Sequence, residues 1–132
     1  VEGFTFEVFS EQLIEFIRTV HWKGVYFRDL SGGNVLIRIE ENNRLVFSLI
    51  DTARARFANQ RFSRSKRIAD LKRLVHKLDP QRQAHFMETY LKQENAHFTA
   101  YDRFNFQLYA YKALLKRLKR KLRKKLYSVI EK

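Results

Sequence analysis

Three polar residues in the first half of the chain have types that suit phosphoryl transfer. The stretch YFRDLSGGNVLI, residues 26–37, places Asp29, two glycines and Asn34 between apolar runs, and Asp51 closes the later run RLVFSLID. In phosphoryl transfer the protein mainly positions groups, holds metal ions and orients the attacking hydroxyl with a carboxylate. The alternative interpretation is that Asp29 and Asn34 are turn residues and that Asp51 caps a loop.

The elements that must position these residues follow from the pattern of the chain. Apolar residues at helical spacing predict a helix over about 11–22, capped by Ser10 and stopped at Gly24. A short strand is expected over 25–27. The β-rich runs NVLIRIE and RLVFSLID, separated by three polar residues, predict a hairpin. We interpret the segment DTARARFANQRF, residues 51–62, as a loop.

Three helices are expected in the second half. Apolar residues recur at helical spacing from about 64 to 78, and Asp79-Pro80 has the form of a cap followed by proline at the first helical position. Thr99 is expected to cap a last, long helix. A single hairpin is not stable alone and must pack on the helices. The predicted fold class is therefore α+β and mostly helical.

The spacing of Asp29 and Asn34 is that of the protein-kinase catalytic loop, H-R-D-x-x-x-x-N. The segment FRDLSGGN matches every named position except the first, where Phe27 replaces the histidine. Asp51 follows a hairpin, as the second kinase aspartate does, but stands in LID-TAR rather than in D-F-G. Without the histidine, the loop must be braced by packing. The missing Phe-Gly argues against a regulatory flip but not against catalysis.

Longer segments carry a resemblance to a known family. HWKGVYFRDLSGGNVLI, FSLIDTARARF and RIADLKRLVHKL resemble the bacterial lipopolysaccharide core kinases, the Kdo and heptose kinases, which are relatives of the protein-kinase fold. The resemblance covers about residues 10–90. It implies the C-terminal lobe of a protein-kinase-like fold with a small β-hairpin. It also implies an ATP-dependent kinase that phosphorylates a sugar hydroxyl of the lipopolysaccharide core glycolipid.

The resemblance further implies roles for individual residues. Asp29 would be the catalytic base that accepts the proton of the substrate hydroxyl. Arg28 would help position either the loop or the segment of Asp51. Asn34 and Asp51 would hold Mg²⁺ against the phosphates of ATP, a site that suits this cation because its ligands are hard oxygens.

Three further residues have two open interpretations each. Arg54 and Arg56 would contact an anionic substrate or steady the loop, but they could equally be surface arginines. Asp70 would brace the catalytic loop from below, or it is an ordinary acid on a helix surface.

A complete kinase also needs a glycine-rich cover for the phosphates and a strand lysine paired with a helix glutamate. Nothing before residue 10 can supply these parts. We therefore expect residues 1–111 to be a kinase-like C-lobe whose partner is the missing N-lobe of the same protein. The fragment alone should be inactive. A naturally reduced pseudokinase is the alternative explanation.

The net charge of +13 is concentrated at the C-terminal end. Residues 112–132 hold ten basic residues and one acid, a charge of +9, and we predict a basic amphipathic tail continuous with the last helix. Apolar residues from Tyr111 to Val129 form one stripe at helical spacing. The predicted anion-binding residues of this tail are Lys116, Arg117, Lys119, Arg120, Lys121, Arg123, Lys124 and Lys125.

Three interpretations of this tail compete. It is the solvated face of a core helix, a helix bound to an anionic membrane surface, or a segment that binds the phosphate backbone of nucleic acid. We expect the membrane, with the protein peripheral on the inner membrane in the bacterial cytoplasm. The alternative function is a catalytically inactive kinase-like or helical module that binds membrane or nucleic acid through this helix.

Overall fold

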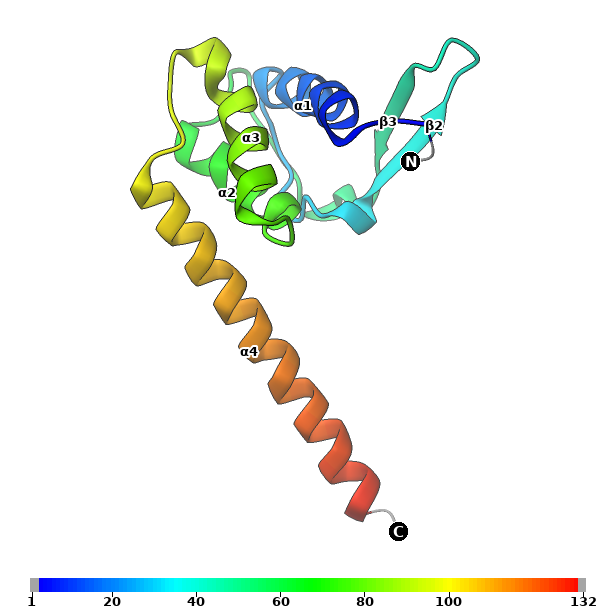
Figure 1. Cartoon of the computed structure of the whole chain (residues 1–132), viewed down its shortest axis with the longest axis vertical. Coiled ribbons are helices and arrows are strands. Elements are labelled where there is room, and N and C mark those ends of the chain that lie inside the picture. The colour runs from blue at the N-terminus through cyan, green and yellow to red at the C-terminus, as the bar shows by residue number, and fades with distance from the viewer. Residues whose placement is uncertain (1–2, 131–132) are drawn as a thin grey trace. The chain divides into compact units, whose positions relative to one another are not determined.

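The computed structural model describes residues 3–130, and the side chains of 126–130 lie outside the described part. The chain divides into two compact units, Val1–Phe98 and Thr99–Lys132. The first contains three α-helices and two small antiparallel sheets, and the second is a single long helix (Figure 1). The expectation of a mostly helical α+β fold is confirmed.

Helix α1 spans Phe6–Trp22 and begins earlier than the sequence predicted. Its N-cap is Thr5, whose side-chain oxygen accepts a hydrogen bond from the backbone nitrogen of Val8 at 3.3 Å. The prediction that Ser10 caps the helix is wrong. Ser10 is fully buried inside α1, and its hydroxyl donates to the backbone oxygen of Glu7. A serine inside a helix commonly forms such a bond to a preceding carbonyl, so its presence does not mark a boundary.

Strand β1, Val25–Tyr26, follows Gly24, which has the positive φ of +78° that favours glycine. The strand pairs antiparallel with β4, Arg56–Phe57, and the backbone nitrogen of Ala58 donates to the oxygen of Gly24. The interpretation of residues 51–62 as loop alone is therefore wrong. A strand of two residues has no periodicity that the sequence could reveal.

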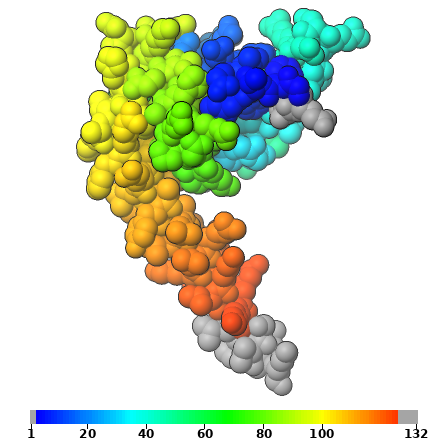
Figure 2. All heavy atoms as spheres, in the orientation of Figure 1, coloured from blue at the N-terminus to red at the C-terminus, as the bar shows by residue number. Residues whose placement is uncertain are grey.

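The predicted hairpin is confirmed as β2, Val35–Ile39, and β3, Leu45–Leu49, with Val35 opposite Leu49. Leu45 and Phe47 are buried, and the ring of Phe47 lies within about 6 Å of the rings of Phe9 and Phe16 on α1. The inner side of β3 thus attaches the hairpin to α1, as Figure 1 shows. In Figure 2 the hairpin atoms, cyan to turquoise, lie beside those of α1.

Helices α2, Arg64–Val75, and α3, Pro80–Leu91, complete the first unit. Asp79 caps α3 as predicted, because its carboxylate accepts from the backbone nitrogen of Arg82 at 3.0 Å. Short 3₁₀ turns occupy Gly32–Asn34, Thr52–Arg54 and Lys92–Glu94. The main buried apolar side chains of these helices and α1 are Leu13, Ile14, Ile17, Leu71, Val75, Phe86, Met87, Tyr90 and Leu91.

The second unit is helix α4, Ala100–Ile130. The side chain of Thr99 accepts a hydrogen bond from the backbone nitrogen of Asp102, which is the predicted cap. The helix is continuous across residue 112, where the basic tail was predicted to start. The predicted stripe members Leu126 and Val129 have side chains outside the described part. Within the described residues, no helix combines the length and the apolar character needed to cross a membrane.

Candidate active site

The loop that carries Asp29 is anchored by Asp70 of α2. The two carboxylate oxygens of Asp70 accept hydrogen bonds from the backbone nitrogens of Phe27 and Arg28, each at 2.7 Å. Asp70 is only 1% exposed, so these bonds replace the water that the carboxylate lost on burial. Of the two interpretations open for Asp70, the structure supports the brace and not the surface acid.

This anchor sets the backbone of Arg28, which has a φ of +69°. A left-handed conformation costs a residue with a side chain about 1 kcal/mol, and two hydrogen bonds to a charged group more than offset it. Phe27 and Leu30 on either side are buried. The expectation that packing braces a loop without the histidine is therefore met, and Asp70 adds a polar anchor to it.

A buried polar chain extends behind Asp70. The Nε2 atom of His21 on α1 lies 3.5 Å from the Asp70 carboxylate, and its Nδ1 atom is 2.8 Å from the Tyr90 hydroxyl. Burial raises the pKa of Tyr90 above its ordinary value, which keeps the phenol protonated. The phenol of Tyr90 can donate or accept, so the tautomer of His21 sets the direction of its bond to Nδ1.

Asn34 joins the loop to the hairpin. Its side-chain nitrogen donates to the backbone oxygen of Asp29 at 2.9 Å, while its own backbone oxygen accepts from the nitrogen of Ile50 at 3.0 Å. Asp51 is the next residue after Ile50. The structure therefore brings the predicted base and both predicted metal ligands to the open end of the β2–β3 hairpin.

The donors at this end fit a magnesium ion. Because the Asn34 amide nitrogen bonds to Asp29, its carbonyl oxygen remains available as a ligand. Asp51 is exposed, has a left-handed φ of +56°, and its carboxylate has no hydrogen-bond or ion-pair partner among the described residues. No group of three or more His, Cys, Asp or Glu that could hold a metal occurs in the described part. Magnesium needs only one or two such ligands beside substrate phosphates and water.

Two arginines meet at the carboxylate of Asp29. The Nη1 atom of Arg54 lies 2.8 Å from Oδ2, and the Nη1 atom of Arg73 on α2 contacts Oδ1. Arg54 was singled out in the sequence, but Arg73 was not. The available signal was its position three residues after Asp70, because residues at that spacing lie on the same face of a helix.

Other predicted residues lie apart from this cluster. Arg56 is in β4 opposite Tyr26, and its exposed side chain has no hydrogen bond or ion pair with another described residue. The predicted cations of the tail all lie on α4 with exposed side chains, and they are Lys116, Arg117, Lys119, Arg120, Lys121, Arg123, Lys124 and Lys125.

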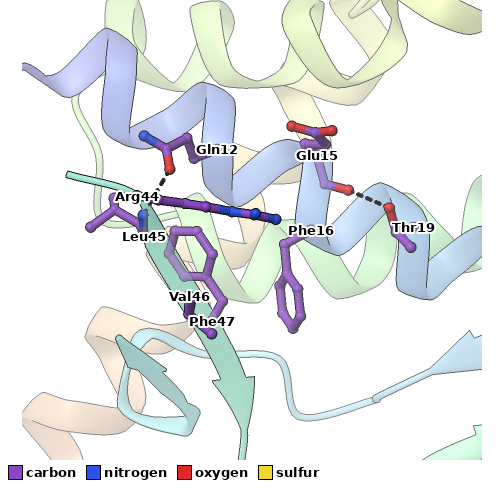
Figure 3. Close-up of a pocket in the computed structure, with 8 residues that line it drawn as sticks. All are labelled: Gln12, Glu15, Phe16, Thr19, Arg44, Leu45, Val46 and Phe47. Carbon is purple, nitrogen blue, oxygen red and sulfur yellow. Dashed lines mark hydrogen bonds between the residues drawn. The ribbon is translucent and has the colours of Figure 1, made fainter. Parts of the chain in front are cut away.

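A cavity of about 280 Å³ lies between α1 and the hairpin, away from these residues. Figure 3 shows that Arg44 extends from the hairpin toward α1, alongside the rings of Phe16 and Phe47, and that Gln12 accepts from the backbone nitrogen of Leu45. None of its eight lining residues was predicted to have a catalytic role. Its contacts explain how the hairpin is held on α1.

Comparison with known proteins gives one fold-level likeness. No family model and no curated protein matches the chain. Among solved structures it is similar to "WaaP in complex with acyl carrier protein", with a TM-score of 0.64 and 20% identity. The match covers 81% of this chain and 48% of that chain, so this chain spans about half of that length. The likeness supports a kinase-like fold for this chain.

Proposed function

We propose that the chain is the catalytic-loop half of an ATP-dependent kinase that phosphorylates a sugar hydroxyl of the lipopolysaccharide core. The observation that carries this proposal is the joining of Asp29, Asn34 and the residue before Asp51 by hydrogen bonds at one end of the hairpin. The fixed loop backbone, the kinase-like fold and the resemblance of the motifs support it.

In this proposal each residue has a defined task. Asp29 accepts the proton of the sugar hydroxyl while the hydroxyl oxygen bonds to the γ-phosphorus and the bond to the β-phosphate oxygen of ATP breaks, releasing ADP. Asn34 and Asp51 hold Mg²⁺, which, when bound, neutralises charge on the phosphates. Asp70 keeps the backbone of Arg28, and therefore the adjacent Asp29, in one orientation.

The nucleotide would be covered by a second lobe of the same protein. Strand β2 presents three apolar side chains to solvent, since Leu36, Ile37 and Ile39 are 51%, 39% and 50% exposed. This apolar edge begins next to Asn34, where a covering lobe would bury it. The match to about half of a longer kinase-like structure agrees with this arrangement. We expect the 132 residues alone to be inactive.

The test uses a protein that joins these residues to a nucleotide-binding lobe. Transfer of labelled phosphate from ATP to core oligosaccharide is measured for wild type, Asp29→Ala and the control Glu41→Ala, an exposed acid in the hairpin turn. Loss of a general base should lower the rate by about 10²- to 10⁴-fold. Asp51→Ala should abolish Mg²⁺-dependent nucleotide binding. An unchanged rate in Asp29→Ala refutes the assignment.

We also propose that α4 attaches the protein to an anionic membrane surface, which would make it peripheral on the bacterial inner membrane. The eight cations predicted to bind anions are exposed and adjoin an apolar stripe, in which Tyr111, Leu115, Leu118 and Leu122 are between 38% and 62% exposed. An apolar stripe beside cations suits the boundary between headgroups and acyl chains. Each lysine or arginine near the membrane surface would contribute about 1 kcal/mol to the free energy of membrane binding.

Sedimentation with vesicles tests this attachment. The chain should bind vesicles that contain phosphatidylglycerol, bind them less at high salt, and ignore pure phosphatidylcholine. Replacing Leu118 and Leu122 by glutamine should also weaken binding, which separates a membrane from a purely electrostatic partner. If the chain binds duplex DNA or acyl carrier protein but does not bind anionic vesicles, the proposal is contradicted.

A further inference from the structure

Arg54 and Arg73 reach Asp29 from two different elements. Arg54 ends the 3₁₀ turn that follows Asp51, and Arg73 lies near the end of α2. Each guanidinium contacts a different oxygen of the carboxylate. The Asp29 side chain is 20% exposed, so the cluster lies at the surface of the proposed site.

The cluster has more positive charge and more donors than its carboxylate needs. Two guanidiniums and one carboxylate have a net charge of +1, and each guanidinium has five N–H donors. Among the described residues, each of these two guanidiniums contacts only Asp29. Their side chains are 59% and 39% exposed, which leaves the remaining donors open to solvent. One arginine would be enough to neutralise Asp29.

We infer that Arg54 and Arg73 form a binding site for a phosphoryl oxyanion beside Asp29. Paired guanidiniums match the geometry of phosphate oxygens. A phosphate has more negative charge and more acceptor oxygens than one carboxylate, so it competes with Asp29 for both arginines. When the anion binds, both arginines exchange the oxygens of Asp29 for those of the phosphate. The oxygens of Asp29 are then open to a substrate hydroxyl.

This inference rests on the proposed function in one respect: the bound anion lies beside the hydroxyl that Asp29 would deprotonate. The phosphoryl group has two sources in such a reaction. It belongs to a phosphomonoester already on the acceptor sugar, or it is the group in transfer from ATP. Both present the same oxyanion to the arginines, so Arg73 becomes a substrate-binding residue in either case.

Binding to the 132-residue chain tests the site without turnover. Inorganic phosphate, glucose 6-phosphate and glucose are titrated by calorimetry and by NMR of the arginine Nε–Hε signals. Phosphate and glucose 6-phosphate should bind, and glucose should not. Arg54→Gln and Arg73→Gln should each weaken binding by roughly ten- to a hundredfold, the range for one charge-assisted contact. The matched control is Arg38→Gln, another exposed arginine whose partner is the carboxylate of Glu40.

Asp29→Asn is the sharpest variant because it removes the competing carboxylate and keeps the side-chain shape. It should tighten phosphate binding several-fold if the two ligands compete for the arginines. Unchanged or weaker binding in Asp29→Asn overturns the exchange. Binding that is absent in wild type, or equal in Arg73→Gln and Arg38→Gln, overturns the site. A backbone amide spectrum like that of wild type shows that each variant is folded.

The two proposals fail separately. If phosphate binds through both arginines but Asp29→Ala leaves turnover intact, the anion site stands and the kinase assignment falls. If turnover needs Asp29 but Arg73→Gln changes neither phosphate affinity nor kinetics, the anion site falls alone. In the active protein, the kinetics of Arg73→Gln distinguish the two sources of the phosphoryl group. A KM that rises only for phosphorylated acceptors shows that the arginines bind the acceptor phosphate. A kcat that falls with every acceptor shows that they bind the group in transfer.

Discussion

Asp70 and Phe27 are 43 residues apart in the sequence, yet Asp70 Oδ2 lies 2.7 Å from the backbone nitrogen of Phe27. The bond uses the main chain of Phe27 and is therefore independent of its side chain. Phe27 stands where a kinase loop usually has histidine. A backbone N–H is available with either residue, so the loop keeps this anchor although the imidazole is absent.

Asp70→Ala should destabilise the first unit strongly. The substitution leaves the backbone nitrogens of Phe27 and Arg28 without their acceptor, at about 1–3 kcal/mol for each unpaired group. We expect the free energy of unfolding in urea to fall by about 3 kcal/mol. The control Glu41→Gln, at an exposed position in the hairpin turn, should change it by less than about 0.5 kcal/mol. Equal stability of the two variants would contradict the anchor.

Gly24→Ala should be far more harmful than Gly32→Ala. At Gly24 the added Cβ would lie 2.1 Å from the backbone oxygen of Ala58, and φ is +78°. The same atom at Gly32 meets nothing within 4 Å. The strain and the clash should cost about 2 kcal/mol or more at Gly24. Thermal unfolding of both variants measures the difference, and similar melting temperatures would refute the close approach of Ala58, the residue after β4, to Gly24.

Replacing Glu94 should destabilise the first unit, because it leaves the buried charge of Arg67 without its partner. Arg67 is 2% exposed, donates to both carboxylate oxygens of Glu94 at 2.8 and 2.7 Å, and lies over the ring of Trp22. Glu94→Gln breaks this pair and leaves Arg67 charged, which should cost about 3 kcal/mol. The matched change Glu40→Gln breaks the exposed pair with Arg38 and should cost less than about 0.5 kcal/mol.

The burial of Tyr90 should make the free energy of unfolding fall as pH rises into the alkaline range. Burial raises its pKa in the folded chain above the unfolded value of 10.0, so folding favours the protonated phenol. Its contribution to stability is complete below pH 10 and is lost as pH rises from there toward the folded pKa. Tyr90→Phe should therefore show a smaller loss of unfolding free energy above pH 10 than wild type. Tyr101→Phe, at an exposed position, should decline as wild type does.

Local pattern predicted much of the secondary structure. Helical spacing of apolar residues located α1, α2 and α3, and Asp79-Pro80 marked the start of α3, because these signals involve residues a few positions apart. The two β-rich runs around a polar turn likewise predicted β2 and β3. The pattern failed at β4, whose pairing with β1 joins Val25 to Phe57, and at the N-cap of α1, where two hydroxyl residues competed.

The candidate site was predicted in part. The spacing of Asp29 and Asn34 and the place of Asp51 after a hairpin singled out these residues, and the structure brings them to one end of that hairpin. Their proposed roles in catalysis and metal binding stay predictions. Arg56 was grouped with Arg54, but only Arg54 contacts Asp29.

By itself the sequence determined the periodic elements, the order of the polar residues along them, and the concentration of positive charge in residues 112–132. Only the tertiary structure decided that Asp70 anchors the loop and that Arg73, 44 residues from Asp29, shares its carboxylate with Arg54. Local spacing is fixed by the repeat of a helix or strand. Contacts between distant residues instead depend on how α2 packs against the loop. This packing removes water from the carboxylate of Asp70, and the backbone nitrogens of the loop then become its hydrogen-bond donors.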